Sequence, residues 1–267
     1  MGFSSTPPVP DAFIDDRGPF DLIGDVHGCA DELEILLERL GYRLGRADAA
    51  GEPIYRLHHP EGRKPVLLGD LVDRGPRSPD VIRLAMHLVE EGLGYCVVGN
   101  HDDKFRRWLM GRDVKLTHGI EATIDQFRSQ PDAFRRRVPG FLDALPHHLL
   151  LDGGDLVVAH AGVHADMHGE ATSRVRAFAM YGEVTGERDA HGLPVRLDWA
   201  RNYSGAATVV HGHVAEPDVR IRNGVYCIDT GCVFGGHLTA LRWPERELVQ
   251  VPAHRTWFTS PRWPVDG

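Results

Sequence analysis

The stretch PVLLGDLVDRG, residues 65–75, decides the fold of this chain. Its first four residues form a short apolar run, which is typical of a strand buried in a parallel sheet. A glycine and polar residues follow the run directly, and the carboxyl ends of strands are where α/β sheets present their ligand-binding loops. The stretch therefore predicts a buried strand that carries Asp70, Asp73 and Arg74 into a functional site.

Two neighbouring segments repeat this pattern. GDVHG at 24–28 follows an apolar strand predicted over 20–23, and GNHD at 99–102 follows another predicted over 95–98. Helical spacing of apolar residues predicts a helix over about 30–40, ending at Gly41, and a second from Ser78 or Pro79 to Gly92. This β-α-β-α-β order implies parallel strands joined by right-handed crossovers, and so an α/β fold.

The remaining segments are predicted from the same periodicities. Residues 42–60 indicate a polar hairpin, and residues 101–145 indicate helices broken at Gly111, Gly119, Pro131 and Pro139. Further strands are predicted over 148–151, 156–159, 208–210, 219–221, 225–228, 238–242 and 248–251. The polar, glycine-rich segment 164–204 is expected to be irregular and to set the choice of substrate, because long irregular segments are usually functional or mobile.

We expect one large domain over residues 20–252, which fits a chain of 267 residues. Residues 1–19 are rich in proline and serine and indicate a flexible N-terminal arm. Residues 253–267 form a C-terminal tail, whose Trp257, Phe258 and Trp263 are expected to pack back onto the domain.

Composition indicates an ordinary soluble protein, with 42% hydrophobic and 25% charged residues. No apolar run approaches the ~20 residues of a membrane span, and the N-terminus lacks the pattern of a signal peptide. We therefore expect a cytoplasmic location and no membrane partner. The four cysteines form no C-x-x-C pair, so we expect free thiols. We expect no structural zinc, because the predicted metal ligands need no thiolate.

A net charge of −8 argues against a stable complex with nucleic acid, because such binding depends on clustered cations. Basic runs do occur at 104–107 and 135–137. Each is interpreted as a solvated helix face, with a cationic rim that steers phosphate ligands as the alternative.

A mixed set of oxygen and nitrogen donors predicts a centre for two divalent ions. Asp25 and His27 alternate along an extended turn, so both side chains reach one ion. Asp70 is the expected bridging carboxylate, and three further side chains complete the second ion. The six expected ligands are Asp25, His27, Asp70, Asn100, His160 and His213. This set suits Mn²⁺ first, with Fe, Zn²⁺ or Ni²⁺ as alternatives, better than Ca²⁺.

The order G-D-x-H-G, G-D-x-x-D-R-G, G-N-H-D, H-A-G and G-H resembles the calcineurin-like metallophosphoesterases over residues 20–252. The D-R-G motif is similar to the phosphoprotein-phosphatase-like branch. This resemblance implies a four-layer α/β/β/α sandwich with a dimetal centre at the strand ends. Segments 99–104, 114–119, 181–187 and 228–236 resemble the phosphatase domain of bacterial polynucleotide kinase–phosphatases, although no kinase P-loop occurs. Segment 229–233 is also similar to symmetrical diadenosine tetraphosphatases.

The resemblance also implies roles for individual side chains. Asp25, His27 and Asp70 hold the first metal, and Asp70 shares the second with Asn100 and the two later histidines. His101 is the implied general acid, oriented by Asp73. A planar guanidinium suits bidentate phosphate recognition, so Arg74 is the expected clamp, with Asn100 also contacting substrate.

Two positions near the end of the motif set depart from parts of the superfamily. The residue two after His213 is Ala215 where another branch carries a second histidine, which fits the phosphoprotein-phosphatase-like branch. His211 is interpreted as a wall of the pocket. A second phosphate-binding arginine is usual in protein phosphatases. The candidates are Arg174, Arg176 and Arg201, of which we carry Arg176 and Arg201 forward as substrate-binding residues.

These inferences predict a dimetal phosphoesterase in which a hydroxide held by the two ions attacks phosphorus. The first substrate hypothesis is phosphomonoesters and 2′,3′-cyclic phosphates of nucleotides or RNA ends. The alternatives are a symmetrical dinucleoside tetraphosphatase or a Ser/Thr protein phosphatase. A catalytically silent phosphate-binding module is the alternative from a different class.

Overall fold

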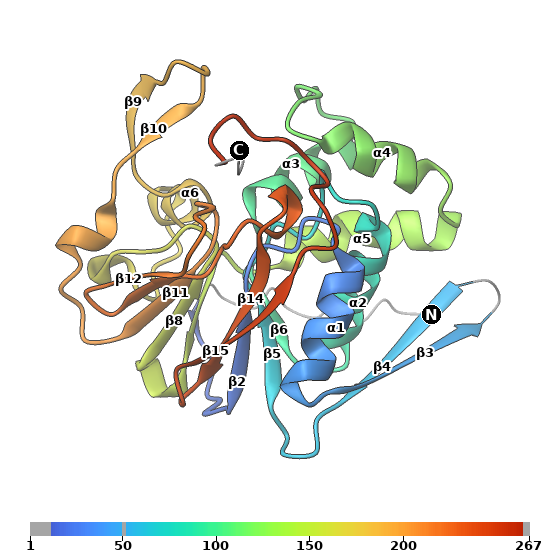
Figure 1. The fold of residues 1–267 in the computed structure, drawn as a ribbon, viewed down its shortest axis with the longest axis horizontal. Helices are drawn as coiled ribbons and strands as arrows, with labels where there is room; N and C mark the ends of the chain where they lie inside the picture. Colours follow the sequence, from blue (N-terminus) through green and yellow to red (C-terminus); the bar gives the residue numbers. More distant parts are fainter. Residues whose placement is uncertain (1–11, 50–51, 264–267) are drawn as a thin grey trace.

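Two β-sheets pack face to face in the computed structural model, which describes residues 12–49 and 52–263 (Figure 1). The first sheet has the order β15-β14-β2-β5-β6. Its strands are β2 (Phe20–Ile23), β5 (Lys64–Leu67), β6 (Tyr95–Cys96), β14 (His237–Trp243) and β15 (Glu247–Pro252). Strands β2, β5 and β6 run parallel, as the β-α-β-α-β pattern predicted, and β14 joins β2 in the antiparallel sense.

The second sheet has the order β1-β7-β8-β11-β13-β12. Its strands are β1 (Ala12–Phe13), β7 (His148–Leu151), β8 (Leu156–Ala159), β11 (Thr208–His211), β12 (Arg220–Arg222) and β13 (Val225–Cys227). Strands β8, β11 and β13 are parallel, so their carboxyl ends lie at one edge of the sheet. That edge supplies the later histidines of the site.

The core between the sheets follows from the two-residue period of a strand. Phe20 and Leu22 of β2 pack in one buried cluster with Leu156 and Val158 of β8 in the opposite sheet. Ile23, the next residue of β2, belongs to the cluster under the helices on the outer face. Each sheet is therefore apolar on both faces, which is why the predicted strands read as continuous apolar runs.

Helices cover both outer faces. Those over the five-stranded sheet are α1 (Ala30–Leu40), α2 (Ser78–Glu90), α3 (Asn100–Leu109), α4 (Ile120–Arg128) and α5 (Asp132–Ala144). The six-stranded sheet is covered by α6 (Ser173–Tyr181) and the 3₁₀ helix η3 (Trp199–Asn202), which pack on β8 and β11. Three further 3₁₀ turns are η1 (Asp152–Gly154), η2 (Ala165–Met167) and η4 (Cys232–Phe234). The predicted four-layer α/β/β/α sandwich is confirmed.

The predicted hairpin over 42–60 is present as β3 (Arg43–Ala49) and β4 (Glu52–His58). Gly41 ends α1 with a φ of 101°, a left-handed conformation that favours glycine. The break predicted at Pro139 was wrong. Pro139 does not break the chain but lies inside α5, where Val138 and Leu142 anchor the helix in the core.

Segment 164–204, predicted to be irregular, contains regular elements. It holds α6 and a hairpin of β9 (Val184–Arg188) with β10 (Pro194–Arg196), which stands off the body at the upper left of Figure 1. The strands of this hairpin are mostly exposed and polar, so they lack the apolar alternation by which a half-buried strand is recognised.

The ends of the described chain lie against the sheets. Within the segment expected to be an arm, Ala12–Phe13 forms β1 and pairs with β7, while residues 1–11 lie outside the described residues. Trp257 and Phe258 pack against the core under the helices. Among the helices in the described ranges, none has the length and apolar character needed to cross a membrane.

Candidate metal centre

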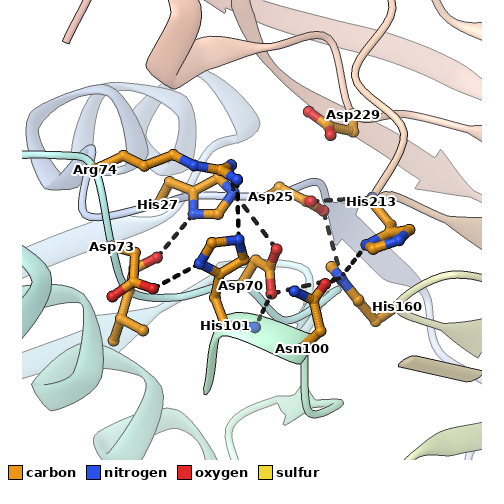
Figure 2. A network of polar contacts seen from close by, with 12 residues as sticks. Asp25, His27, Asp70, Asp73, Arg74, Asn100, His101, His160, His213 and Asp229 are labelled. Carbon is orange, nitrogen blue, oxygen red and sulfur yellow. Dashed lines mark hydrogen bonds and ion pairs between the residues drawn. The ribbon is translucent and has the colours of Figure 1, made fainter. Parts of the chain in front are cut away.

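The polar side chains singled out from the sequence converge where loops leave the carboxyl ends of five strands (Figure 2). They follow β2, β5 and β6 in one sheet and β8 and β11 in the other, so the centre lies at the junction of the two sheets. These residues are Asp25, His27, Asp70, Asp73, Arg74, Asn100, His101, His160 and His213. The structure therefore brings together every predicted metal ligand.

Three acceptor atoms meet around His160. Its Nδ1 donates to the carbonyl oxygen of Leu68 at 2.9 Å, which leaves only a lone pair on Nε2. That Nε2 lies 3.0 Å from Asn100 Oδ1 and 3.4 Å from Asp70 Oδ1. Lone pairs that face one another with no proton between them repel. A divalent cation coordinated by all of them would remove that repulsion. His213 Nδ1 lies 3.0 Å from the same nitrogen.

His27 presents a second lone pair by the same device. Its Nδ1 donates to the carbonyl oxygen of Val72 at 2.8 Å, and its Nε2 lies 3.5 Å from Asp70 Oδ2. A backbone carbonyl that fixes the tautomer of a histidine is a common outer partner of metal ligands. Asp70 thus offers one oxygen toward His27 and the other toward His160, as a bridging carboxylate requires.

Unpartnered buried atoms also fit a metal centre. Within the described part of the chain, Asp25 Oδ1 and His213 Nε2 are buried and have no hydrogen-bond partner. Buried polar atoms are nearly always paired, so exceptions call for an explanation such as an ion. Burial raises the pKa of Asp25 well above its ordinary value, and the charges of Asp229 and Asp70 add to that effect. A bound cation would relieve this crowding of carboxylates.

Backbone strain concentrates at the centre. Five of its residues have a positive φ, a conformation that side chains other than glycine rarely adopt. They are His27 (44°), Asp70 (46°), Asp73 (75°), Arg74 (72°) and His213 (70°). Strain of this kind persists where the surrounding structure holds it, and it clusters at functional sites.

Two glycines allow the loops to approach closely. A Cβ on Gly99 would collide with the backbone nitrogen and Oδ1 of Asp70, and one on Gly212 would collide with Oδ1 of Asp25. The glycines that flank the motifs are therefore needed for the carboxylates to reach the centre.

His101 and Asp73 form the predicted pair. His101 Nδ1 donates to Asp73 Oδ2 at 2.6 Å, and Thr123 Oγ1 donates to the other carboxylate oxygen at 2.9 Å. Burial raises the pKa of Asp73 to about 7. Burial lowers the pKa of His101 well below its usual range, and the charge of Arg74 acts in the same direction. The pair holds the His101 ring so that Nε2 faces the centre.

Arg74 contacts two histidines of the centre. Its Nη1 donates to His27 Nε2 at 2.5 Å and its Nη2 to His101 Nε2 at 2.9 Å. The guanidinium also lies 5.1 Å from the ring centroid of Phe234 and 5.7 Å from that of Phe258. Its two terminal nitrogens therefore point at the reacting region, while an aromatic surface lies beside it.

The other predicted arginines have exposed side chains. Arg176 is exposed on α6, and Arg201 is 70% exposed with its Nε 3.2 Å from Asp198. Arg196 at the end of β10 was missed by sequence reasoning. It is partly buried, its pKa is lowered by burial, and its charge lowers the pKa of His213. No motif marks this residue, because its position depends on how the hairpin leaves the body.

Asp229 is a second residue that was not assigned to the site. It follows β13, it is buried, and Figure 2 shows it above Asp25. Burial raises the pKa of Asp229 to about 6. The signal was available, since Asp229 follows an apolar strand, as Asp70 does, and a glycine lies two residues after it.

Comparisons with known proteins agree with this geometry. The model of the calcineurin-like phosphoesterase family matches residues 18–217. A bis(5′-nucleosyl)-tetraphosphatase PrpE [asymmetrical] of Geobacillus sp. (strain WCH70) is 43% identical over 87% of this chain and 94% of its own length. The protein of the same name from Bacillus subtilis (strain 168) is 43% identical over 88% of this chain and 94% of its own length.

Solved structures show the same fold. The crystal structure of a protein assigned as a diadenosine tetraphosphatase has a TM-score of 0.65 at 24% identity, covering 92% of this chain and 99% of that one. A serine/threonine phosphatase from Saccharomyces cerevisiae has a TM-score of 0.59 at 13% identity, covering 95% and 84%. From its motifs, its fold and these matches, this chain belongs to the calcineurin-like metallophosphoesterase family and is a metal-dependent phosphoester hydrolase.

Proposed function

We propose that this hydrolase cleaves dinucleoside 5′,5′-tetraphosphates asymmetrically, into a nucleoside triphosphate and a nucleoside monophosphate. Relatives that carry this activity in their names align with nearly the whole chain at 41–44% identity. The sequence had favoured phosphomonoesters and cyclic phosphates, with symmetrical cleavage of tetraphosphates among the alternatives. The proposal expects a cytoplasmic enzyme, because the four free cysteines stay reduced there.

One feature of the structure supports a nucleotide as the substrate. Arg74 connects the histidines of the centre with the partly buried rings of Phe234 and Phe258, and Trp263 packs on Phe234 with ring centroids 5.7 Å apart. A guanidinium suits a polyphosphate, and aromatic faces stack on bases. A phosphate chain with a nucleoside at its end fits this arrangement better than a phosphate alone.

We propose that Asp25, His27 and Asp70 hold one cation, and that Asp70 shares a second with three more residues. Those three are Asn100, His160 and His213. Mn²⁺ is the proposed native ion, ahead of Fe, Zn²⁺ and Ni²⁺, because the donors mix carboxylate, amide and imidazole without a thiolate. Two divalent cations in such a site lower the pKa of water and neutralise phosphoryl oxygens.

The chain's own residues then position and protonate the substrate. Arg74 clamps phosphoryl oxygens with its two terminal nitrogens and so leaves His101 Nε2 free to carry a proton. His101 gives that proton to the departing oxygen, while Asp73 holds the ring and stabilises its charged form. A nucleotide is a good leaving group, so His101 should matter less for tetraphosphates than for alkyl esters.

Product analysis tests the proposal. Mn²⁺-loaded protein is incubated with diadenosine tetraphosphate, and the products are separated by anion-exchange chromatography. We expect AMP and ATP in equal amounts, with kcat/KM above those for p-nitrophenyl phosphate and 2′,3′-cyclic AMP. ADP as the only product would show symmetrical cleavage, and a preference for the cyclic nucleotide would favour the hypothesis drawn from the polynucleotide kinase–phosphatase resemblance.

A further inference from the structure

A second group of possible metal donors lies outside the centre described above. It consists of Cys29, Glu32 and Cys232, whose donor atoms all lie within 4.8 Å of one another. Cys29 precedes α1, Glu32 is in its first turn, and Cys232 begins η4. Their side chains are at most 2% exposed. The two cysteines are far apart in the sequence, so no local spacing motif indicates the group.

Glu32 is the unusual member of this group. Its Oε1 accepts hydrogen bonds from the backbone N–H of His254 at 3.0 Å and from Trp257 Nε1 at 3.1 Å. Its Oε2 is buried and, across the described ranges, has no hydrogen-bond partner. Leaving a buried carboxylate oxygen unpaired is costly, so a cationic partner is expected at this position.

The two thiols of the group differ from the other cysteines. Cys29 donates only a long hydrogen bond, 3.8 Å, to the carbonyl oxygen of His27, and its thiol lies within 4.8 Å of that of Cys232. Cys96 and Cys227 instead donate to backbone carbonyls, those of Val97 at 3.4 Å and Val214 at 3.3 Å. The latter pair are satisfied as neutral thiols, whereas the former face each other beside a carboxylate.

We propose that Cys29, Cys232 and Glu32 bind a third divalent cation, of the zinc class, separate from the catalytic pair. Zn²⁺ takes thiolate and carboxylate ligands together, and its binding releases the two thiol protons to solvent. The ion gives Glu32 Oε2 its missing partner. His254, whose Nδ1 lies 4.0 Å from Glu32 Oε1, is a candidate for the fourth ligand.

Such an ion would be structural and would act on the catalytic loops indirectly. Cys29 lies two residues after His27, and Cys232 lies three residues after Asp229. The ion would therefore join the first motif, the loop after β13 and, through Glu32, the C-terminal tail. No structural zinc was expected from the sequence, because the predicted catalytic ligands need no thiolate, and the proposed site lies outside those ligands.

Cobalt provides the test, because its thiolate complexes absorb strongly in the near ultraviolet. The donors of the catalytic centre are oxygen and nitrogen only, so this charge-transfer band reports the thiol group alone. Full-length protein is stripped with a chelator, reduced, and titrated with Co²⁺ without oxygen. We expect three equivalents bound with a charge-transfer band, loss of the band and of one equivalent in Cys232→Ser, and no change in the matched control Cys96→Ser.

Two equivalents without the band in the wild-type protein would overturn the proposal. A mass two hydrogens lower after aerobic purification would assign the pair to a disulfide instead, and would overturn it as well. If Cys232→Ser does not fold, X-ray absorption on wild-type protein loaded with one equivalent of Zn²⁺ in excess Mn²⁺ decides. Sulfur at ~2.3 Å supports the site, and oxygen and nitrogen alone contradict it. None of these readouts depends on phosphoesterase activity.

Discussion

At the scale of single residues, His101 is the side chain whose role the geometry defines most closely. Its Nδ1 is fixed by Asp73 at 2.6 Å, and its Nε2 faces the centre. A general acid contributes about 10²–10⁴-fold in rate. We expect His101→Asn to lower kcat on an alkyl phosphomonoester by about that factor, and by less on diadenosine tetraphosphate. Metal content, measured by mass spectrometry, should stay at the wild-type value.

The dependence of rate on leaving group provides the control for this variant. Across a series of phosphate esters, His101→Asn should be increasingly impaired as the pKa of the leaving alcohol rises. Hydrolysis of the poorest leaving group at the wild-type rate would show that His101 is not the acid.

Arg196 and Arg201 can be compared directly. Arg196 is partly buried, and its charge lowers the pKa of His213. Arg201 is largely exposed. A hydrogen bond from a charged group contributes about 1.5–3 kcal/mol, which corresponds to about 10–100-fold in binding. We expect Arg196→Ala to raise KM for diadenosine tetraphosphate within that range. Steady-state kinetics on the matched Arg201→Ala should match wild type, and the opposite ranking would restore Arg201 as the second clamp.

Most of the candidate site could be predicted at this scale because its residues share a local signal. Asp25, Asp70 and Asn100 each follow an apolar strand and a glycine, so the strand positions the residue and the glycine permits close approach. Arg196 and the Cys29–Cys232 pair carry no such signal. Their neighbours are set by tertiary packing, which one-dimensional spacing does not encode.

At the scale of elements, a buried ion pair joins Asp21 of β2 to Arg63, the residue before β5. Asp21 is fully buried and accepts two hydrogen bonds from Arg63 Nε, both at 3.0 Å, and one from Tyr42 at 2.8 Å. Removing one charge of a buried pair costs about 3–5 kcal/mol when the other is left uncompensated. Arg63 would keep Glu245, which is 48% exposed, as a carboxylate partner, so the lower end of that range, about 3 kcal/mol, applies. We expect Asp21→Asn to lower the free energy of unfolding by about that amount in urea denaturation.

The control for Asp21→Asn is a pair of the same residue types on the surface. Asp125 and Arg128 are 73% and 70% exposed, so Asp125→Asn should change stability by less than about 1 kcal/mol. Equal effects of the two substitutions would show that burial does not set the strength of the β2 pair.

Asp16 connects the segment before β2 to strands β5 and β6. Its carboxylate allows a test of how stability depends on pH in acid. It accepts hydrogen bonds from Lys64 at 2.5 Å and Tyr95 at 2.6 Å. Burial raises its pKa, but the bonds to Lys64, Tyr95 and Gly18 outweigh burial, so the folded pKa lies below 3.8. The stability that Asp16 contributes is therefore fully present above pH 3.8 and is lost as pH falls through the folded pKa.

Unfolding titrations from pH 7 to pH 2 check this sign. The difference in unfolding free energy between wild type and Asp16→Asn should be constant near neutrality and shrink below about pH 4. A difference that grows on acidification would contradict the assigned pKa direction.

Elements with strong periodicity were predicted well, and those without it were not. The helix over 30–40 and the strands over 148–151 and 156–159 have the predicted bounds, because each has a regular apolar face and a clear stop. The hairpin β9–β10 was missed because its side chains are largely exposed. Pro139 was misread because packing on both sides of it keeps α5 continuous.

At the scale of the whole molecule, the two sheets divide the centre between them. The five-stranded sheet supplies Asp25, His27 and Asp70, and the six-stranded sheet supplies His160 and His213. The parallel β-α-β order of the first sheet could be predicted from the sequence. The strand order of the second sheet could not, because long connections separate β8, β11 and β13. The family resemblance, rather than periodicity, predicted that the sheets stack.

Asp70 faces His27 with one oxygen and His160 with the other, so its removal tests the central claim most directly. Protein stripped of metal, wild type beside Asp70→Asn, is titrated with Mn²⁺ while hydrolysis of diadenosine tetraphosphate is followed. The account predicts activity that appears with Mn²⁺ in wild type and is lost by at least about 10²-fold in the variant. Full activity of Asp70→Asn, or wild-type protein that binds two ions and hydrolyses no phosphoester, would contradict it.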